Sequence, residues 1–198
     1  KDVLVSQFSE GPEGITDSSL AVKKDGGGLV DKVYVFPTNS DNHRMAKIRL
    51  CKTRVPETGD KFGSRHGQKG TIGLVMEAEN MPYTKEGIVP DMIVNPHAFP
   101  SRMTIGQFLE VLGSKVAVDL GFIFDGTAFQ DQNLEELGEI LEEKCGYDRT
   151  GNEILYSGRT GEQLDCEFFI GPTFYQRLKQ MVQDKINSRA RGPMTMRE

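Results

Sequence analysis

Residues 59–73 carry the most informative pattern of this chain and read GDKFGSRHGQKGTIG. Five glycines punctuate the stretch, and four basic residues stand between them: Lys61, Arg65, His66 and Lys69. Glycine lets backbone N–H groups approach an anion closely, and lysine supplies a compact, mobile charge, so the stretch suits a phosphate group. It is not a Walker A loop, because glutamine stands where the second glycine would fall and no hydroxyl residue follows Lys69. A solvent-exposed basic turn therefore remains an equal alternative.

Strand-like patterns lie on both sides of this stretch. β-Branched, aromatic or alternating apolar residues occur at residues 29–36, 45–55, 72–76, 154–156 and 167–170. The first two runs, joined by a turn over residues 38–42, predict a β-hairpin, and residues 72–76 predict a buried strand. Residues 1–28 are punctuated by glycine and proline, and we expect them to be irregular.

Apolar residues at helical spacing predict three helices. The helices cover residues 105–116, 134–145 and 175–186. Glutamates surround the apolar stripe of the second helix, a pattern typical of a solvated face, whereas the third helix carries a basic stripe. Strands at both ends of the chain with helices inserted between them predict one α+β unit.

The net charge of −5 conceals two opposite local charges. Residues 131–148 contain seven acidic residues and one basic residue, a net charge of −6, whereas residues 177–191 contain five basic residues and one acidic residue, a net charge of +4. The overall charge argues against a protein that binds polyanions over its whole surface, but nucleic acids bind to local basic patches. The basic stretch is therefore a candidate contact surface for a phosphate backbone, with a merely solvated face as the alternative.

Other kinds of site find little support in the sequence. Cys51, Cys145 and Cys166 stand far apart without a C-x-x-C pair, so we expect small buried side chains in a reducing compartment, not disulfides or a zinc site. The histidines lack a motif of nucleophilic catalysis, and no D-x-D-x-D run is present, so we expect no metal ligands in this chain. No apolar run reaches the roughly 18–20 residues of a transmembrane helix, and we expect no membrane partner.

Three ordered blocks of the sequence resemble the second-largest subunit of multisubunit DNA-directed RNA polymerases. The first block is residues 59–71. The second comprises residues 87–98, GIVPDMIVNPHA, and residues 100–104, PSRMT. The third comprises residues 171–178, GPTFYQRL, and residues 184–194. The blocks are more similar to the eukaryotic, archaeal and large-DNA-virus branch of the family than to the bacterial branch.

The resemblance implies a fold, an activity and partners. The expected fold is a double-psi β-barrel-like sheet with inserted helices and a C-terminal basic helix, in one hybrid-binding domain of residues 1–198 that is a fragment of a longer subunit. Strands of residues 29–76 and 150–172 would share the barrel-like sheet. The chain would be part of a nucleotidyltransferase that transcribes DNA, and it would be inactive alone. Its partners would be the largest subunit and other subunits, the DNA template, RNA and nucleoside triphosphates, in the nucleus of a eukaryote or the cytoplasm for an archaeal or viral enzyme.

The resemblance also implies roles for three cations near the substrate. Lys61 and Lys69 resemble the two active-centre lysines of the family, which point toward the RNA 3′ end and the phosphates of the incoming nucleotide. Arg102 resembles an arginine that reaches the nucleotide triphosphate. Phosphoryl transfer depends on positioned cations near the phosphate oxygens, so these roles agree with the chemistry of the side chains. The family's Mg²⁺ would be held mainly by the largest subunit and not by this chain alone.

Three further basic residues would contact the nucleic acid. Lys185, Arg189 and Arg191 would line the RNA–DNA hybrid through backbone charge, without reading sequence. Gln180 and Asn187 stand where the family has histidines, and these residues hydrogen-bond but cannot become charged. Two rival interpretations are a free-standing nucleic-acid-binding barrel without polymerase partners and a phosphate-binding enzyme domain of another type.

Overall fold

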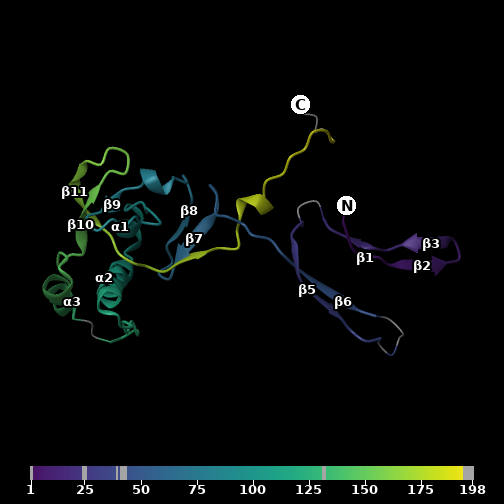
Figure 1. Ribbon diagram of the computed structural model, residues 1–198, viewed down its shortest axis with the longest axis horizontal. Coiled ribbons are helices and arrows are strands. Elements are labelled where there is room, and N and C mark those ends of the chain that lie inside the picture. Colours follow the sequence, from purple (N-terminus) through teal and green to yellow (C-terminus); the bar gives the residue numbers. More distant parts are fainter. Residues whose placement is uncertain (1, 24–25, 39, 41–43, 131–132, 194–198) are drawn as a thin grey trace. The chain divides into compact units, whose positions relative to one another are not determined.

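The computed structural model describes residues 2–23, 26–38, 40, 44–130 and 133–193 (Figure 1). The chain forms two compact units, residues 1–56 and residues 57–198, which are described in turn. Both strands and helices are present, which agrees with the α+β class predicted from the sequence. None of the helices in the described residues is long and apolar enough to cross a membrane.

The first unit consists of antiparallel strand pairs. Strand β1 (Val3–Val5) pairs with β4 (Leu20–Ala21), and β2 (Phe8–Gly11) pairs with β3 (Gly14–Asp17). The expectation that residues 1–28 are irregular is therefore wrong. The glycines that suggested irregularity here serve a tight turn, because Gly14 adopts a φ of 116°, which is accessible mainly to glycine.

The predicted β-hairpin is confirmed as β5 (Leu29–Val35) and β6 (Ala46–Cys51), so the second strand ends four residues before the predicted end at residue 55. Most of the predicted turn over residues 38–42 lies outside the described residues. A β-bulge between Val30 and Lys32 shifts the register. As a result three apolar pairs share one face of the ladder: Val30 with Leu50, Val33 with Ile48, and Val35 with Ala46.

The second unit contains two three-stranded sheets. One has the order β12-β7-β8, formed by Tyr175–Arg177, Lys61–Ser64 and Lys69–Thr71. The other has the order β11-β10-β9, formed by Gln163–Phe169, Asn152–Tyr156 and Tyr83–Thr84. The strand patterns at residues 154–156 and 167–170 are thereby confirmed, although β11 ends at Phe169.

The helices of the second unit form its apolar core. Helix α1 (Ala98–Arg102) is short, α2 (Ile105–Leu120) is the longest, and α3 (Leu134–Ile140) continues into the π-helical turn η2 (Leu141–Cys145). Two 3₁₀ turns, η1 (Ala78–Asn80) and η3 (Val182–Asp184), complete the set. Val116 of α2 packs with Leu137 and Leu141, which confirms the helices predicted over residues 105–116 and 134–145.

A buried lysine holds α2 against the second sheet. Lys115 is 6% exposed, and its Nζ donates to the carboxylate of Glu153 at 2.5 Å. It also donates to the carbonyl oxygens of Gly151 and Ile170, at 3.1 and 3.2 Å. The buried charge is thus paired and hydrogen-bonded, as a charge removed from water requires. These contacts fix the orientation of α2, which carries the polar residues of the site described below.

The C-terminal basic helix expected over residues 175–186 is not formed. Residues 175–177 instead extend along β7 as strand β12, and the N–H of Leu178 continues the pairing by donating to the Lys61 carbonyl at 2.8 Å. Only η3 is helical in this segment. The helix was predicted from apolar residues three and four positions apart. An extended segment that completes a sheet can show the same spacing, so the spacing alone was not sufficient.

The described strands form five separate sheets, and none of them closes into a barrel. The prediction that strands of residues 29–76 and 150–172 share one sheet is wrong for this part of the chain. Strands β7 and β8 pair with β12, β5 pairs with β6, and β10 and β11 pair with each other and with β9.

Two further expectations about burial are wrong. Residues 72–76 form no strand, and Leu74, Val75 and Met76 are 73%, 61% and 45% exposed. Cys51 and Cys166 are also exposed, and only Cys145 is partly buried. An apolar run predicts a preference for burial, but burial also needs a neighbouring element, and no described element covers these side chains.

Candidate functional site

The glycine-rich stretch folds into a hairpin that places two lysines on one face. Strands β7 and β8 are joined by a turn, closed by a hydrogen bond from the Ser64 N–H to the Gln68 carbonyl at 2.9 Å. Lys61 lies opposite Thr71, and Gly63 lies opposite Lys69. Residues that lie opposite each other, or two apart along a strand, share a face of a sheet. Lys61 and Lys69 therefore lie diagonally on one face; Lys69 is exposed and Lys61 is half-buried.

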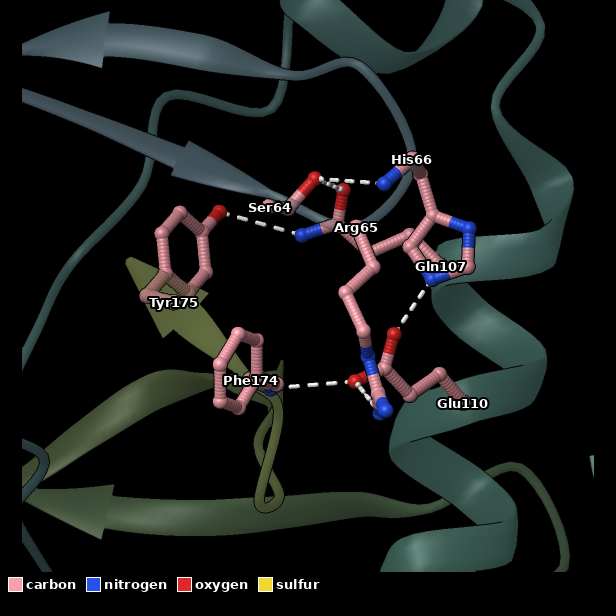
Figure 2. Close-up of polar contacts among 7 residues, drawn as sticks. All are labelled: Ser64, Arg65, His66, Gln107, Glu110, Phe174 and Tyr175. Atoms are coloured by element: carbon pink, nitrogen blue, oxygen red, sulfur yellow. Dashed lines mark hydrogen bonds and ion pairs between the residues drawn. The ribbon is translucent and has the colours of Figure 1, made fainter. Parts of the chain in front are cut away.

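The opposite face of the same sheet packs toward α2. The Ser64 hydroxyl donates to Gln107 Oε1 at 3.4 Å, and Gln107 Nε2 donates to the hydroxyl of Tyr175 at 3.0 Å (Figure 2). Gln107 is only 3% exposed, so the centre of this small network is buried, whereas Ser64 and Tyr175 are partly exposed. Because side chains alternate between faces, anchoring Ser64 toward α2 directs the face that carries Lys61 and Lys69 away from the helix.

The two basic residues of the turn bind a carboxylate on α2 (Figure 2). Arg65 lies 2.6 Å from Glu110, and the imidazole of His66 contacts the second oxygen of the same carboxylate. The N–H of Phe174 donates to Glu110 at 3.0 Å, and the Arg65 guanidinium lies 5.1 Å from the centre of the Phe174 ring. Burial alone would raise the pKa of Glu110, but the hydrogen bonds from Arg65, Phe174 and His66 outweigh it and lower the pKa.

The four basic residues of the glycine-rich stretch therefore have two different uses. Arg65 and His66 tie the turn to α2 through Glu110, whereas Lys61 and Lys69 lie on the face turned away from that helix. The turn itself requires its glycine, because Gly67 has a φ of 72°. Neither of the two alternatives, a phosphate loop or a solvated basic turn, describes the whole stretch. The tip of the hairpin is bound to α2, and its strands carry Lys61 and Lys69.

The turn is also joined to α1, the helix that ends with Arg102. The side chain of Gln68 is buried, and its Nε2 donates to the Ala98 carbonyl at 3.1 Å and to the Thr104 hydroxyl at 2.7 Å. Ala98 is the first residue of α1, and Thr104 lies two residues beyond its end, at the N-cap of α2. Arg102 is exposed at the last position of that helix, so a chain of short contacts links it to the strand that begins with Lys69.

Asp60 joins the hairpin to the C-terminal basic segment. Asp60 is 0% exposed, and its carboxylate accepts hydrogen bonds from Arg177 at 2.5 Å, from the N–H of Val182 at 3.0 Å and from the N–H of Glu57 at 3.2 Å. The Val182 hydrogen bond is the main cause that lowers the pKa of Asp60, and the contacts with Glu57 and Arg177 act in the same direction against the effect of burial. Arg177 is thus part of the framework and does not belong to an open basic face.

The remaining basic residues of the C-terminal segment follow without helical structure. Lys185 directly follows η3, and Lys185, Arg189 and Arg191 are all exposed. Arg189 donates to the Pro193 carbonyl oxygen within the same segment. Residues 194–198, which include the last residue of the third sequence block, lie outside the described part of the chain. The structure thus brings Lys61 and Lys69 together on one face, and it presents the other predicted cations as exposed side chains.

The described residues contain no group of three or more histidine, cysteine, aspartate or glutamate side chains placed to hold a metal ion. The acidic residues of α3 and η2 are exposed, as expected for a solvated face, and the carboxylates of Glu139 and Glu142 lie 3.5 and 2.6 Å from Arg149. The acidic stretch begins at residue 131, which lies outside the described residues.

Comparison with known proteins identifies the class to which this sheet, turn and basic segment belong. A family model described as RNA polymerase Rpb2, domain 6, matches residues 2–197. The chain belongs to this family, which confirms the resemblance to the second-largest subunit of multisubunit RNA polymerases.

Curated relatives come from both eukaryotes and archaea. The chain is 50% identical over 178 residues to DNA-directed RNA polymerase II subunit 2 of Arabidopsis thaliana, a match that covers 90% of this chain and 15% of the relative. It is 46% identical over 180 residues to DNA-directed RNA polymerase III subunit RPC2 of Schizosaccharomyces pombe, covering 91% and 15%. It is 45% identical over 179 residues to DNA-directed RNA polymerase subunit Rpo2 of Saccharolobus shibatae, covering 90% and 16%. The chain thus spans 15–16% of the length of these relatives.

Sequence reasoning missed three residues that organise the site: Asp60, Gln68 and Glu110. Asp60 and Gln68 each stand next to a predicted lysine, so their place in the first block was a usable signal. Glu110 lies 45 residues from Arg65, on a helix whose apolar stripe gave no indication of a polar partner.

Proposed function

We propose that this chain is a hybrid-binding part of the second-largest subunit of a DNA-directed RNA polymerase. It acts within a longer subunit and an assembled enzyme, and it does not polymerise nucleotides alone. The single observation that carries the proposal is the common face of Lys61 and Lys69, which is turned away from α2 while the other two basic residues of the stretch are tied to Glu110. Family membership over residues 2–197 supports the assignment.

The proposed chemistry is nucleotidyl transfer. Negative charge spreads over the phosphate oxygens during this reaction, and positioned cations supply much of the catalysis. Lys61 and Lys69 act as the catalytic cations, near the RNA 3′ end and the phosphates of the incoming nucleotide, and Arg102 binds the triphosphate. The tied turn supports these roles, because a charge that is held in place before the reaction need not be ordered during it.

The basic C-terminal segment has a separate role in this proposal. Lys185, Arg189 and Arg191 contact the sugar–phosphate backbone of the RNA–DNA hybrid. Their exposure, and the absence of regular secondary structure beyond η3 in the described residues, suit contacts that depend on charge and not on a fixed geometry.

The other partners complete what this chain lacks. Mg²⁺ stabilises the charge of the transferring phosphoryl group when bound, and the described residues offer no suitable ligand set, so we assign the metal to the largest subunit. We propose that residues 1–198 act as one hybrid-binding domain that contributes strands to a double-psi β-barrel. The enzyme works inside the cell, in the nucleus of a eukaryote or in the cytoplasm for an archaeal or viral host.

The test is single-nucleotide addition by the assembled polymerase carrying Lys61→Ala or Lys69→Ala. Removal of one preorganised charge at a developing anion typically costs about 10²–10³ in rate. We expect a loss of this size, with binding of the template much less affected. The matched control is Lys144→Ala, which removes an exposed lysine from η2 and should leave the rate unchanged.

An addition rate that stays within a few-fold of wild type in both variants would reject the proposed catalytic role. A free-standing nucleic-acid-binding barrel predicts a different result: the chain would bind nucleic acid without a largest subunit and would not assemble with one. The polymerase names of the curated relatives do not favour that alternative.

A further inference from the structure

We propose that Gln68 is a positioning residue that couples Arg102 to Lys69, so that the two cations bind the nucleotide triphosphate as one unit. The proposal rests on the function proposed above, and it concerns a residue to which that function gives no role. Gln68 is 6% exposed, and its amide donates to the first residue of α1, Ala98, and to Thr104, the N-cap of α2. Its backbone continues directly into β8, whose first residue is Lys69.

Helix α1 depends on such contacts for its position. It has five residues, far fewer than the roughly 12–15 that an isolated helix needs for stability in water. No side chain caps its N-terminus, and Met103 ends it in the left-handed conformation with a φ of 53°. The rings of Phe99 in α1 and Phe108 in α2, whose centres are 4.8 Å apart, also hold it. A helix this short has little rigidity of its own, so the Gln68 amide sets the place of Arg102.

The chemistry of the amide explains why glutamine suits this position. An amide nitrogen carries two donor hydrogens, and Gln68 Nε2 has two acceptors, the Ala98 carbonyl and the Thr104 hydroxyl. A carboxylate of the same length would accept only and would meet the Ala98 oxygen with a like charge. The Thr104 hydroxyl is engaged with Gln68 and does not cap α2, although Thr104 stands at the N-cap position of that helix. One side chain thus fixes both the start of α1 and the junction between α1 and α2.

Displacement of Arg102 should weaken nucleotide binding more than it slows the chemical step. Arg102 binds the triphosphate in the proposed function, and the loss of a binding contact raises KM when the saturated rate is retained. In the assembled polymerase, Gln68→Met should raise KM for the nucleoside triphosphate about tenfold, because a shift of about 1 Å in a binding group has effects of this order or larger. The rate at saturating nucleotide should fall by less than about threefold.

The decisive measurement is a double-mutant cycle with Arg102→Ala. If Gln68 acts through Arg102, then Gln68→Met should add little to the KM of the Arg102→Ala enzyme, because the group that it positions is already absent. Thr104→Val removes one acceptor from the other side of the contact. Thr104→Val should give a smaller rise in KM with the same dependence on Arg102. This variant tests the coupling if the enzyme with Gln68→Met does not assemble. Gln163→Met, at an exposed position of β11, is the matched control and should change nothing.

The possible outcomes separate the two proposals. If Arg102→Ala raises KM but Gln68→Met and Thr104→Val leave it unchanged, or if their effects add fully to that of Arg102→Ala, the coupling is overturned and the proposed function stands. If Arg102→Ala itself leaves KM unchanged, the proposed role of Arg102 in substrate binding fails, and the coupling fails with it.

Discussion

The hairpin of residues 59–71 and the segment of residues 178–191 both carry exposed basic side chains, but they are held in very different ways. The tip of the hairpin is bound to Glu110, and the end of its turn is bound to the start of α1 and to the junction between α1 and α2. Beyond η3, the C-terminal segment has no regular secondary structure in its described residues, and its side chains are exposed. The first region presents charges in a fixed geometry, whereas the second presents charges that can adapt.

The difference matches two ways in which proteins use positive charge. Catalysis of phosphoryl transfer gains from cations that are already in place, since reorganisation during the reaction is costly. Binding to a nucleic-acid backbone gains from the release of condensed counterions, which depends on the number of contacts more than on their exact angles. Lys61 and Lys69 therefore fit the first use, and Lys185 and Arg189 fit the second.

Asp60 joins the hairpin to the C-terminal segment, so its substitution should affect both regions. Asp60→Asn keeps the shape of the side chain but removes the negative charge beside Arg177. Loss of this contact should shift Lys61 and release the chain after Arg177, so nucleotide addition should slow by about 10²-fold and the hybrid complex should weaken as well. Both readouts should change, whereas Lys69→Ala should change mainly the rate. The measurements are single-nucleotide addition and dissociation of the RNA–DNA hybrid from the assembled enzyme.

The control for Asp60 is Asp165→Asn, which neutralises an exposed carboxylate of β11. The pKa of Asp60 is lowered, chiefly by the Val182 hydrogen bond, so its carboxylate contributes stability at neutral pH that is lost only as the pH falls through that lowered value. The defect of Asp60→Asn should accordingly be present across the neutral range. If the two variants behave alike, the buried contact does not hold the two regions together.

The sequence predicted part of the fold, but it did not predict the contacts that hold the candidate site. The helices α2 and α3 follow from helical apolar spacing, and the hairpin of residues 29–51 follows from alternation and from its β-branched residues; together they give the α+β class. The third helix was wrong because β7 offers an open edge to residues 175–177, and this tertiary pairing overrides local spacing. The partners of the hairpin could not be predicted, because Gln107 and Glu110 lie 43 and 45 residues along the chain from Ser64 and Arg65 and reach them only after folding.

Neutralising the basic side chains of the C-terminal segment should have a smaller effect than Asp60→Asn, and it should be limited to hybrid binding. We expect the double variant Lys185→Gln and Arg189→Gln to weaken the hybrid complex at low salt while nucleotide addition changes little. Each lost backbone contact should flatten the log–log salt dependence by about 0.7–0.9, so two contacts should reduce the slope by about 1.4–1.8. The difference from wild type should therefore shrink roughly tenfold between about 50 and 200 mM salt. Complex lifetime across a salt titration measures this effect.

A salt dependence identical to that of wild type would show that these two residues do not contact the backbone. A large fall in addition rate at saturating substrate would instead place them in the catalytic geometry, and the distinction between fixed and adaptable charges would fail.

The smallest expected effect concerns the acidic helix, where the charge has the opposite sign. Glu135 and Glu136 stand in the first turn of α3, and their N–H groups donate to the Asn133 side chain, so these carboxylates lie near the positive end of the helix dipole. Glu139 contacts Arg149 on the surface, and exposed pairs of this kind contribute little to stability. Glu135→Gln with Glu139→Gln should therefore leave both the hybrid lifetime and its salt slope nearly unchanged. If this variant changes the salt slope more than the Lys185 and Arg189 variant does, the nucleic-acid face lies on α3, and the C-terminal segment is the solvated one.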